Sequence, residues 1–350
     1  MTIREIAIEC GVSVATVDRV INKRGKVRPE TEARIAKILE QSGYSKNIAA
    51  RALAIRKDYP TIGVLVSSEG NPFFDEVLAG IRRAQAELTD LGVSLIVRTM
   101  HGYCADTQLK IIDELTPSIS ALVLHPIDDP RIVSKISELQ KNNIPTITIN
   151  SDLEHSVRLC YVGSDYMQGG QTAAGLMCLA TQGKRQLGIL TGVDTILGHR
   201  QRLRGFEEYL TKTCSRIRII ARASAEDDDY QAYLATLKLL RNNPRIDTLQ
   251  LIAAGLHGVC EAVLELKKNR CVCLFAFDQI PATEAAMKNG FLKAVVSQQP
   301  FEQGYQAIRA AQNVILTGSP VNEKVIMENQ IYIYENLKSI NVKAGKLDKI

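Results

Sequence analysis

The chain has 350 residues, of which 45% are hydrophobic and 23% charged, and its formal net charge is +5. This composition is that of a soluble globular protein with more than one domain, and its apolar runs are too short to cross a bilayer, which excludes a membrane-spanning protein. Residues 1–60 contain 12 Lys and Arg against 7 Asp and Glu, whereas residues 61–350 contain 31 of each. The net positive charge therefore lies in the first sixty residues, where it favours a small unit that binds a polyanion such as DNA.

This basic segment is predicted to begin with two short helices, because apolar residues recur at helical spacing over residues 3–10 and again over 14–22. Gly11 tolerates positive φ and supplies the turn between them, and Ser13 is placed to cap the second helix. Two short helices joined by such a turn are typical of a helix-turn-helix, whose second helix enters the major groove. A third helix is predicted from Pro29. Its expected inward residues are Ala33, Ile35, Ala36 and Leu39.

The exposed positions of the second helix are candidates for reading bases. Arg19 can bind a guanine through two hydrogen bonds, and Val14 and Ala15 can contact thymine methyl groups. Asp18 can accept from a cytosine amino group, or it can pair with a neighbouring arginine that reads a base. The alternative, a three-helix bundle without a DNA partner, fits the basic surplus less well. The expected DNA-contacting residues here are Ser13, Val14, Ala15, Thr16, Asp18, Arg19 and Asn22.

The run TIREIAIECGVSVATVDRVIN, followed by VRPETEARIAKILEQSGY, resembles the headpiece of the LacI family of transcriptional regulators. The segment NIAARAL at 47–53 is similar to the hinge helix of that family. The resemblance implies that this helix folds on DNA and that the paired helices of a dimer enter the minor groove, where Leu53 wedges between base steps. The recognition helix departs from the family at Asp18, where serine is usual. The hinge residues that the resemblance assigns to DNA are Asn47, Ala50, Arg51 and Leu53.

From Thr61 onwards strand-like runs alternate with helical ones, which is the pattern of βα units and parallel sheets. The sequence contains no GxGxxG after a strand and no GxxxxGK[ST], GxSxG or HExxH, so we expect neither an enzyme nor a cofactor or metal site. The eight cysteines are scattered and form no CxxC pair, which favours buried free thiols over a disulfide framework or a zinc site.

The body also resembles the ribose-binding-protein type of periplasmic sugar-binding fold, through segments such as NPFFDEVLAGI, SALVLHPID, VGSDYMQGGQTAAGLM and VVSQQPFEQG. The implied architecture is α/β: an all-α helix-turn-helix headpiece followed by a two-lobed, periplasmic-binding-protein-like (type I) effector domain with parallel sheets. The chain would cross between the lobes near Gly163, Ala294 and Met327. The expected boundaries are 1–46 for the headpiece, 47–60 for the hinge helix and linker, 61–335 for the effector domain and 336–350 for the tail. Lobe 1 would comprise about 61–162 plus 294–326, and lobe 2 about 163–293 plus 327–335.

The resemblance places the ligand in the cleft between the lobes, at the carboxyl ends of the strands. Asp278 would accept from two hydroxyls, and Arg200, in HRQRLRGF, would donate to ring and hydroxyl oxygens. The expected ligand-binding residues differ from the ribose pattern at two places. Asn150 and Ser151 replace an Asp-Arg pair, and Gly255 replaces an asparagine. The expected effector-binding residues are Asn71, Phe73, Phe74, His125, Asn150, Asp152, Arg200, Gly255, Asp278 and Gln298.

These features predict a sequence-specific transcriptional regulator, in the first instance a repressor, that is cytoplasmic and associated with the nucleoid. Its expected partners are double-stranded operator DNA, a second copy of the chain, and a small polyhydroxylated effector such as a sugar, a polyol or a sugar acid, with a nucleoside as a further alternative. Residues 335–350 lack apolar heptads, which favours a dimer over a tetramer. Two alternatives stay open: an α/β enzyme fused to a DNA-binding headpiece, and an architectural protein whose body only dimerises.

Overall fold

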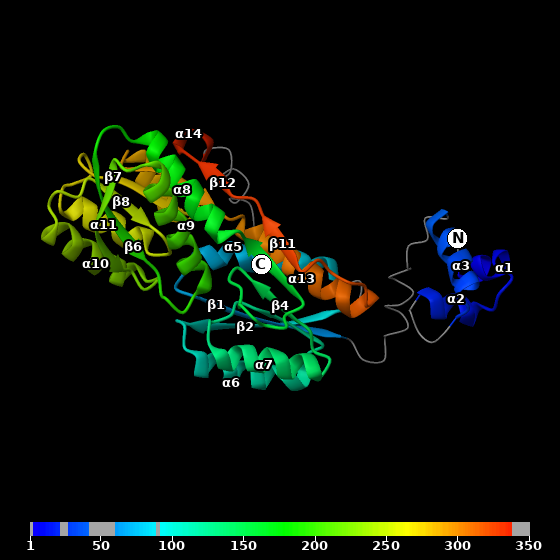
Figure 1. Ribbon diagram of the computed structural model, residues 1–350. Helices are drawn as coiled ribbons and strands as arrows, with labels where there is room; N and C mark the ends of the chain where they lie inside the picture. Colours follow the sequence, from blue (N-terminus) through cyan, green and yellow to red (C-terminus); the bar gives the residue numbers. More distant parts are fainter. Residues whose placement is uncertain (1–2, 22–26, 42–59, 89–91, 338–350) are drawn as a thin grey trace. The chain divides into compact units, whose positions relative to one another are not determined.

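The computed structural model describes residues 3–21, 27–41, 60–88 and 92–337. The chain forms two compact units, Met1–Ala54 and Ile55–Ile350 (Figure 1). The predicted hinge residues Asn47, Ala50, Arg51 and Leu53 lie outside the described residues, as does the predicted DNA contact Asn22.

The first unit is a three-helix headpiece. Gly11 has φ +60° and links the first two helices, and the amide of Thr16 donates to Oγ of Ser13 at 3.1 Å, as the predicted cap requires. The helices are α1 (Ile3–Glu9), α2 (Val14–Ile21) and α3 (Pro29–Gln41). Their shared core contains Ile6, Ala7, Cys10, Val17 and Ile35, all buried.

The inward face of α3 differs from the prediction. Ala33 and Ala36 are exposed, whereas Ile38 and Leu39 pack with Ile35 against the core. Residues 35, 38 and 39 follow the i, i+3, i+4 spacing of one helix face. Their large side chains bury more apolar surface than alanine can, so this face and not the alanine face packs against the core.

The second unit contains two six-stranded sheets with the same strand-order pattern. In sheet A the order is β11-β5-β4-β3-β1-β2, and every pair is parallel. In sheet B the order is β12-β10-β9-β8-β6-β7, and only the β10–β12 pair is antiparallel. The strands of sheet A are β1 (Thr61–Glu69), β2 (Ser94–His101), β3 (Ala121–Leu124), β4 (Thr146–Ile149), β5 (Cys160–Ser164) and β11 (Lys324–Met327). Those of sheet B are β6 (Arg185–Thr191), β7 (Ile217–Ser224), β8 (Thr248–Leu251), β9 (Cys273–Phe277), β10 (Leu292–Ser297) and β12 (Gln330–Tyr332).

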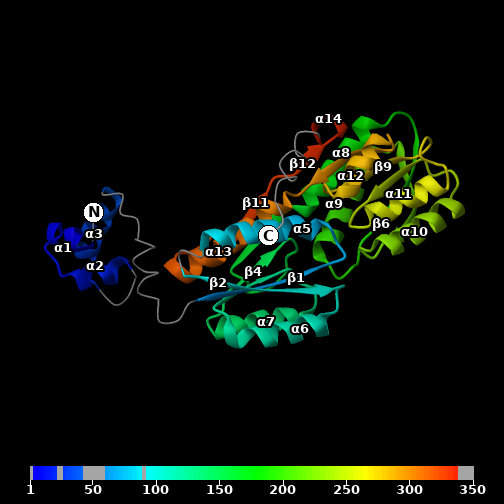
Figure 2. The ribbon, with the colours of Figure 1, turned by 180° about the vertical axis from the view of Figure 1, so that it is seen from behind.

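Helices cover both faces of each sheet, so that each lobe is a three-layer α/β sandwich (Figure 1, and from behind in Figure 2). Sheet A lies between α5 (Phe73–Leu88) with α13 (Pro300–Thr317) and α6 (Ala105–Leu115) with α7 (Pro130–Lys141). Sheet B lies between α8 (Tyr166–Ala180) with α9 (Leu197–Thr213) and α10 (Asp229–Asn242), α11 (Leu256–Glu265), α12 (Pro281–Lys288) and α14 (Tyr334–Leu337). Within the described residues, no helix combines the length and apolarity that a membrane span needs.

The chain passes between the lobes three times. It leaves sheet A after β5, returns after β10, and leaves again between β11 and β12. The first and third crossings lie next to Gly163 and Met327, as predicted. The prediction for the second was Ala294, but Ala294 pairs with Phe275 inside sheet B, and the crossing follows β10 at Gln298 and Gln299. The lobe boundary therefore lies after Ser297 and not at Ala294, because β10 extends to Ser297 before the chain returns to lobe 1.

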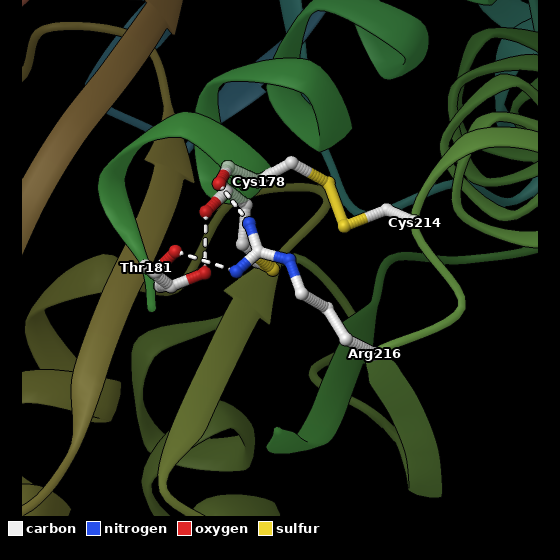
Figure 3. Close-up of a disulfide and its surroundings, with 5 residues drawn as sticks. Cys178, Thr181, Cys214 and Arg216 are labelled. Atoms are coloured by element: carbon white, nitrogen blue, oxygen red, sulfur yellow. Dashed lines mark hydrogen bonds between the residues drawn. A yellow bond between two sulfur atoms is a disulfide. The ribbon is translucent and has the colours of Figure 1, made fainter. Parts of the chain in front are cut away.

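Helices α8 and α9 approach each other backbone to backbone. A Cβ on Gly170 would lie 2.0 Å from the carbonyl oxygen of Arg202, so a side chain there would force the helices apart. The close approach brings the helix ends together, and Cys178 and Cys214 form a disulfide there, with Cα atoms 6.6 Å apart (Figure 3). The expectation of free thiols was wrong for this pair, because a contact between helix ends 36 residues apart leaves no spacing signal in the sequence.

Candidate functional site

A cavity lies between the two lobes at the carboxyl ends of their strands. The space between its walls, counted together with the adjoining open solvent, is about 680 Å³, and residues of both lobes line it. Five of its polar side chains follow strands directly or within two residues, after β1, β3, β4, β9 and β10. They are Asn71, His125, Asn150, Asp278 and Gln298. Parallel strands thus deliver polar groups from both lobes to one place.

Asp278 is the most constrained carboxylate of the cavity. It has φ +63°, a left-handed conformation that Asp tolerates better than most residues, and the residue is 8% exposed. Its Oδ1 accepts from the backbone amide of Gln298 at 3.1 Å, and its Oδ2 accepts from Nε2 of Gln298 at 2.7 Å. Burial raises the pKa of Asp278, while Arg202 and the two bonds from Gln298 oppose that shift. The carboxylate is therefore held rigidly, with lone pairs left for a ligand.

Arg202 brings a positive charge to the same cavity. Its guanidinium carbon lies 3.9 Å from the ring centroid of Phe277 and 4.8 Å from that of Tyr166. Its Nη1 donates to the carbonyl of Ile252 at 2.6 Å, and burial lowers the pKa of Arg202. Its Nε is buried and has no partner among the described residues, so this N–H donor is unused within the described part of the chain.

His125 is a second buried group whose hydrogen-bonding capacity is unused. Only 1% of it is exposed, its ring packs against Phe74 with centroids 5.0 Å apart, and neither ring nitrogen has a partner in the part of the chain that the structure describes. Gln108 fixes the loop around it by donating to the carbonyl of His125 and accepting from the amide of Ile127, both at 3.0 Å. Burial lowers the pKa of His125 to about 3, so the ring is neutral near pH 7, with one donor and one acceptor.

Asp227 and His199 form a third polar group at the wall of the cavity. Oδ2 of Asp227 lies 3.5 Å from Nδ1 of His199 and accepts from the amide of Val193, while Oδ1 accepts from the amide of Ala254. Burial lowers the pKa of His199, and the charge of Asp227 opposes that shift. One carboxylate therefore connects three loops of lobe 2 and orients the imidazole.

At the rim, three polar contacts bridge the lobes. Asp128, from the loop between β3 and α7, pairs with Arg200 near the start of α9. The amide of Asp128 donates to the carbonyl of Thr195 at 2.8 Å, and the amide of Gly198 donates to Oγ of Ser151 at 3.4 Å. We call these three contacts the rim clasp. They hold the loops of lobe 1 against the start of α9.

The headpiece presents the surface expected of a recognition helix. Val17 is fully buried, whereas Val14, Ala15 and Arg19 are exposed, so α2 turns one face to the core and the other outwards. Ser13 is exposed as well, and Thr16 and Asp18 are half-buried.

The chain matches two family models, which together cover both units. Residues 2–47 match the model described as bacterial regulatory proteins, lacI family, and residues 62–319 match the periplasmic binding protein domain. The chain belongs to the LacI family of bacterial regulators. Its body is a periplasmic binding protein domain, as both the family model and the sheet topology show.

Individual relatives of this LacI-family regulator fall into the same two groups. The ribose import binding protein RbsB of Escherichia coli is 23% identical over 300 residues, which are 86% of this chain and 98% of RbsB. The HTH-type transcriptional regulator MalR of Streptococcus pneumoniae is 24% identical over 292 residues, which are 80% of this chain and 84% of MalR. The crystal structure of GanP, a glucose-galactose binding protein from Geobacillus stearothermophilus, has 26% identity and a TM-score of 0.73, and the match covers 79% of this chain and 99% of GanP.

Most of the side chains predicted for the effector site of the regulator line this one cavity. The lining includes the predicted residues Asn71, Phe73, Phe74, His125, Asn150, Gly255, Asp278 and Gln298. Gly255 has φ +104°, and a Cβ there would lie 2.5 Å from that of Ala232, so the expected asparagine would not fit this backbone.

Two predicted residues lie outside the lining. Arg200 is directed to Asp128 and to the carbonyl of Asp194, and Arg202 is the arginine that lines the cavity. Residues two apart on a helix point about 200° away from each other, so only one of the pair can face the cavity. Asp152 is instead held by Arg158 through bonds of 2.7 and 2.8 Å and by Oγ1 of Thr148. That pairing uses both of its oxygens.

Several residues that line the cavity of the regulator were not predicted from the sequence. Asp227 follows β7 and could have been found by the strand-end rule that identified Asp278, because both loops lie at carboxyl ends of sheet B. Tyr103 and Tyr166 had no such signal, since an aromatic near a helix start is equally typical of a core residue. The lining residues not predicted include Tyr103, Tyr166, Ile196, His199, Arg202, Asp227, Asp229, Phe277 and Ile280.

The neutral His125 makes the stability of the regulator dependent on pH. Because its pKa falls from 6.5 to about 3 on folding, the unfolded chain binds a proton between these pH values that the folded chain does not. The free energy of unfolding should therefore fall as the pH drops below 6.5, by up to about 1.4 kcal/mol per pH unit from this group. Urea unfolding of His125→Gln at pH 7.0 and 5.5 should show a smaller loss than the unmodified chain. His101→Gln, at an exposed site, is the control, and equal losses in all three proteins would contradict the assignment.

Proposed function

We propose that this regulator is a homodimeric repressor whose affinity for operator DNA is set by a small polyhydroxylated effector bound in the cavity between the lobes. Two headpieces related by two-fold symmetry would read two half-sites. The effector and the operator would alter each other's binding by the same factor. The regulator would act at the nucleoid, in the cytoplasm.

The observation that carries the effector part is that several residues lining the cavity contain buried polar atoms without a partner among the described residues. They are both ring nitrogens of His125, Nε of Arg202 and Oε1 of Gln298. An unpartnered buried polar atom costs about 1–3 kcal/mol, so several around one cavity favour an occupant that supplies the missing bonds. Phe74, Tyr166 and Phe277 add ring faces to the wall. Donors, acceptors and ring faces together suit a molecule with several hydroxyl groups.

Binding by the full chain tests this function directly. The protein is first used to select duplexes from a random-sequence pool, and the enriched duplexes serve as its operator. Thermal unfolding is then followed with sugars, polyols and sugar acids, because a molecule that binds only the folded state raises the Tm. A molecule that raises the Tm and also changes the operator Kd supports the proposal. Effector binding that leaves the operator Kd unchanged would contradict it.

The same selected operator tests the recognition helix. Arg19→Ala should weaken binding by about 1–3 kcal/mol and relax the preference at one base pair in each half-site. Arg19 is exposed on α2, so the substitution should not affect the core. Lys37→Ala, at an exposed site on α3, is the matched control and should leave the base preferences intact. Unchanged base preferences in Arg19→Ala would exclude Arg19 as a base-reading residue.

An enzyme with a fused headpiece is the second candidate, because the cavity holds carboxylates and imidazoles in one place. Incubation of the full chain with any molecule that raises the Tm separates the two. Recovery of that molecule unchanged supports a regulator without catalytic activity, and the appearance of a product supports an enzyme.

A further inference from the structure

We propose that the effector carries no negative charge, so that the cavity accepts neutral polyhydroxylated molecules and rejects sugar acids and sugar phosphates. This inference rests on the proposed function of the same cavity and narrows the class of its ligand.

The charged side chains that line the cavity are mostly acidic. Among the described residues of the lining, Asp227, Asp229 and Asp278 contribute carboxylates, Arg202 contributes the one guanidinium, and there is no lysine. Asp227 and Asp278 are 9% and 8% exposed, so water screens their charges poorly. An anion in this cavity would face three carboxylates and a single cation.

The charge of Arg202 is already balanced within the protein. Asp278 and Asp227 act on it electrostatically, two aromatic rings lie against its guanidinium, and Nη1 is bonded to the carbonyl of Ile252. Arg200, the arginine nearest in sequence, pairs with Asp128 at the rim and adds no positive charge to the lining of the cavity. The cation thus offsets one of the carboxylates, and the others remain to repel a bound anion.

The two histidines of the lining do not supply further positive charge. Burial lowers the pKa of His125 to about 3, and burial also lowers the pKa of His199 although Asp227 opposes it. Near neutral pH both rings therefore act as hydrogen-bonding groups without charge.

The unpartnered acceptors in the wall of the cavity also favour a neutral ligand with hydroxyl groups. Oε1 of Gln298 accepts nothing from the described residues, and the two oxygens of Asp278 retain lone pairs beyond the bonds from Gln298. Nε of Arg202 is a buried donor that lacks a partner in the described ranges, and a neutral His125 offers one N–H and one acceptor. The wall thus includes acceptors that need a donor from the bound molecule. A hydroxyl group can donate to them, whereas a carboxylate or phosphate oxygen can only accept.

Matched sets of probes test, with the full chain, whether the cavity rejects negatively charged ligands; we call this rejection the charge rule. Each set holds one neutral parent and its anionic derivatives: D-glucose with glucuronate and glucose 6-phosphate, D-galactose with galacturonate and galactose 6-phosphate, D-ribose with ribose 5-phosphate, and myo-inositol with its monophosphate. Tm shifts identify the set that binds, and calorimetry measures each Kd. Within that set the neutral parent should bind at least about 30-fold more tightly than its anions, because unpaired like charges in a buried site are strongly unfavourable.

A pair of substitutions in the wall gives a second readout that does not depend on absolute affinity. Asp229→Asn removes one carboxylate of the lining, so the ratio of the Kd of the anion to that of its neutral parent should fall about threefold or more. Asp75→Asn removes a carboxylate from an exposed position of α5 outside the lining and should leave the ratio unchanged.

The outcomes separate this inference from the proposed function. An anionic derivative that binds as tightly as its parent, or a ratio that Asp229→Asn does not lower, would overturn the charge rule and leave the effector site in place. Absence of binding by every member of every set would count against a carbohydrate effector itself, and with it against both proposals.

Discussion

Asp278→Ala is expected to abolish the response to the effector while the unliganded protein keeps its affinity for operator DNA. The carboxylate is buried, is oriented by two bonds from Gln298 and retains lone pairs that can accept ligand hydroxyls. A hydrogen bond to a charged group contributes about 1.5–3 kcal/mol, so the loss of two should weaken effector binding at least about 100-fold. Calorimetry with the effector and gel-shift titration with the operator measure the two affinities.

A second substitution at Asp278 and a control substitution elsewhere distinguish the loss of a ligand contact from a defect in folding. Alanine at φ +63° adds backbone strain, whereas asparagine tolerates that conformation and preserves the shape of the side chain. Asp278→Asn should therefore fold like the unmodified chain and still weaken effector binding by about tenfold or more, because it removes only the charge and part of the acceptor capacity. Glu208→Ala, in an exposed pair with Arg204 on α9, should change neither affinity. A normal effector response in Asp278→Asn would place the effector elsewhere.

Reversal of one charge in the rim clasp should weaken effector binding although neither partner lines the cavity. In Arg200→Asp two carboxylates face each other across the lobes in place of an ion pair. The pair is partly exposed and contributes at most about 1 kcal/mol, and repulsion of similar size doubles the effect, so the Kd should rise by up to about 30-fold. If the effector binds the bridged arrangement of the lobes, the apparent Kd rises as that arrangement becomes less populated.

The double variant decides whether this effect belongs to the pair. Arg200→Asp combined with Asp128→Arg restores opposite charges across the rim and should recover most of the lost affinity. The coupling should shrink in high salt, because both side chains are reached by solvent. Additive losses in the double variant would show that the two residues act separately and that the clasp does not stabilise the bound form.

The sequence predicted those features that depend on local periodicity and strand ends. The glycine turn and the cap at Ser13 fixed the start of α2, and the strand-end rule led to Asn150 and Asp278. The errors arose where the position of a residue depends on the rotational phase of a helix or on pairing between residues far apart in the sequence. Arg200 and Arg202 differ only in which side of α9 they occupy, and nothing in the sequence pairs Cys178 with Cys214.

The order of the strands in sheet A has a mechanical consequence. Strands β5 and β11 lead to crossings and lie at one edge of the sheet. Strand β1, the first strand of the body, lies four strand positions from β11. With neighbouring strands about 4.8 Å apart, this lever arm is about 19 Å long. A rotation of roughly 10° about the crossings would displace β1 by about 3 Å, which is close to the rise of one base pair along a DNA helix. A small change of angle at the cavity would thus become a displacement of about one base-pair step at β1.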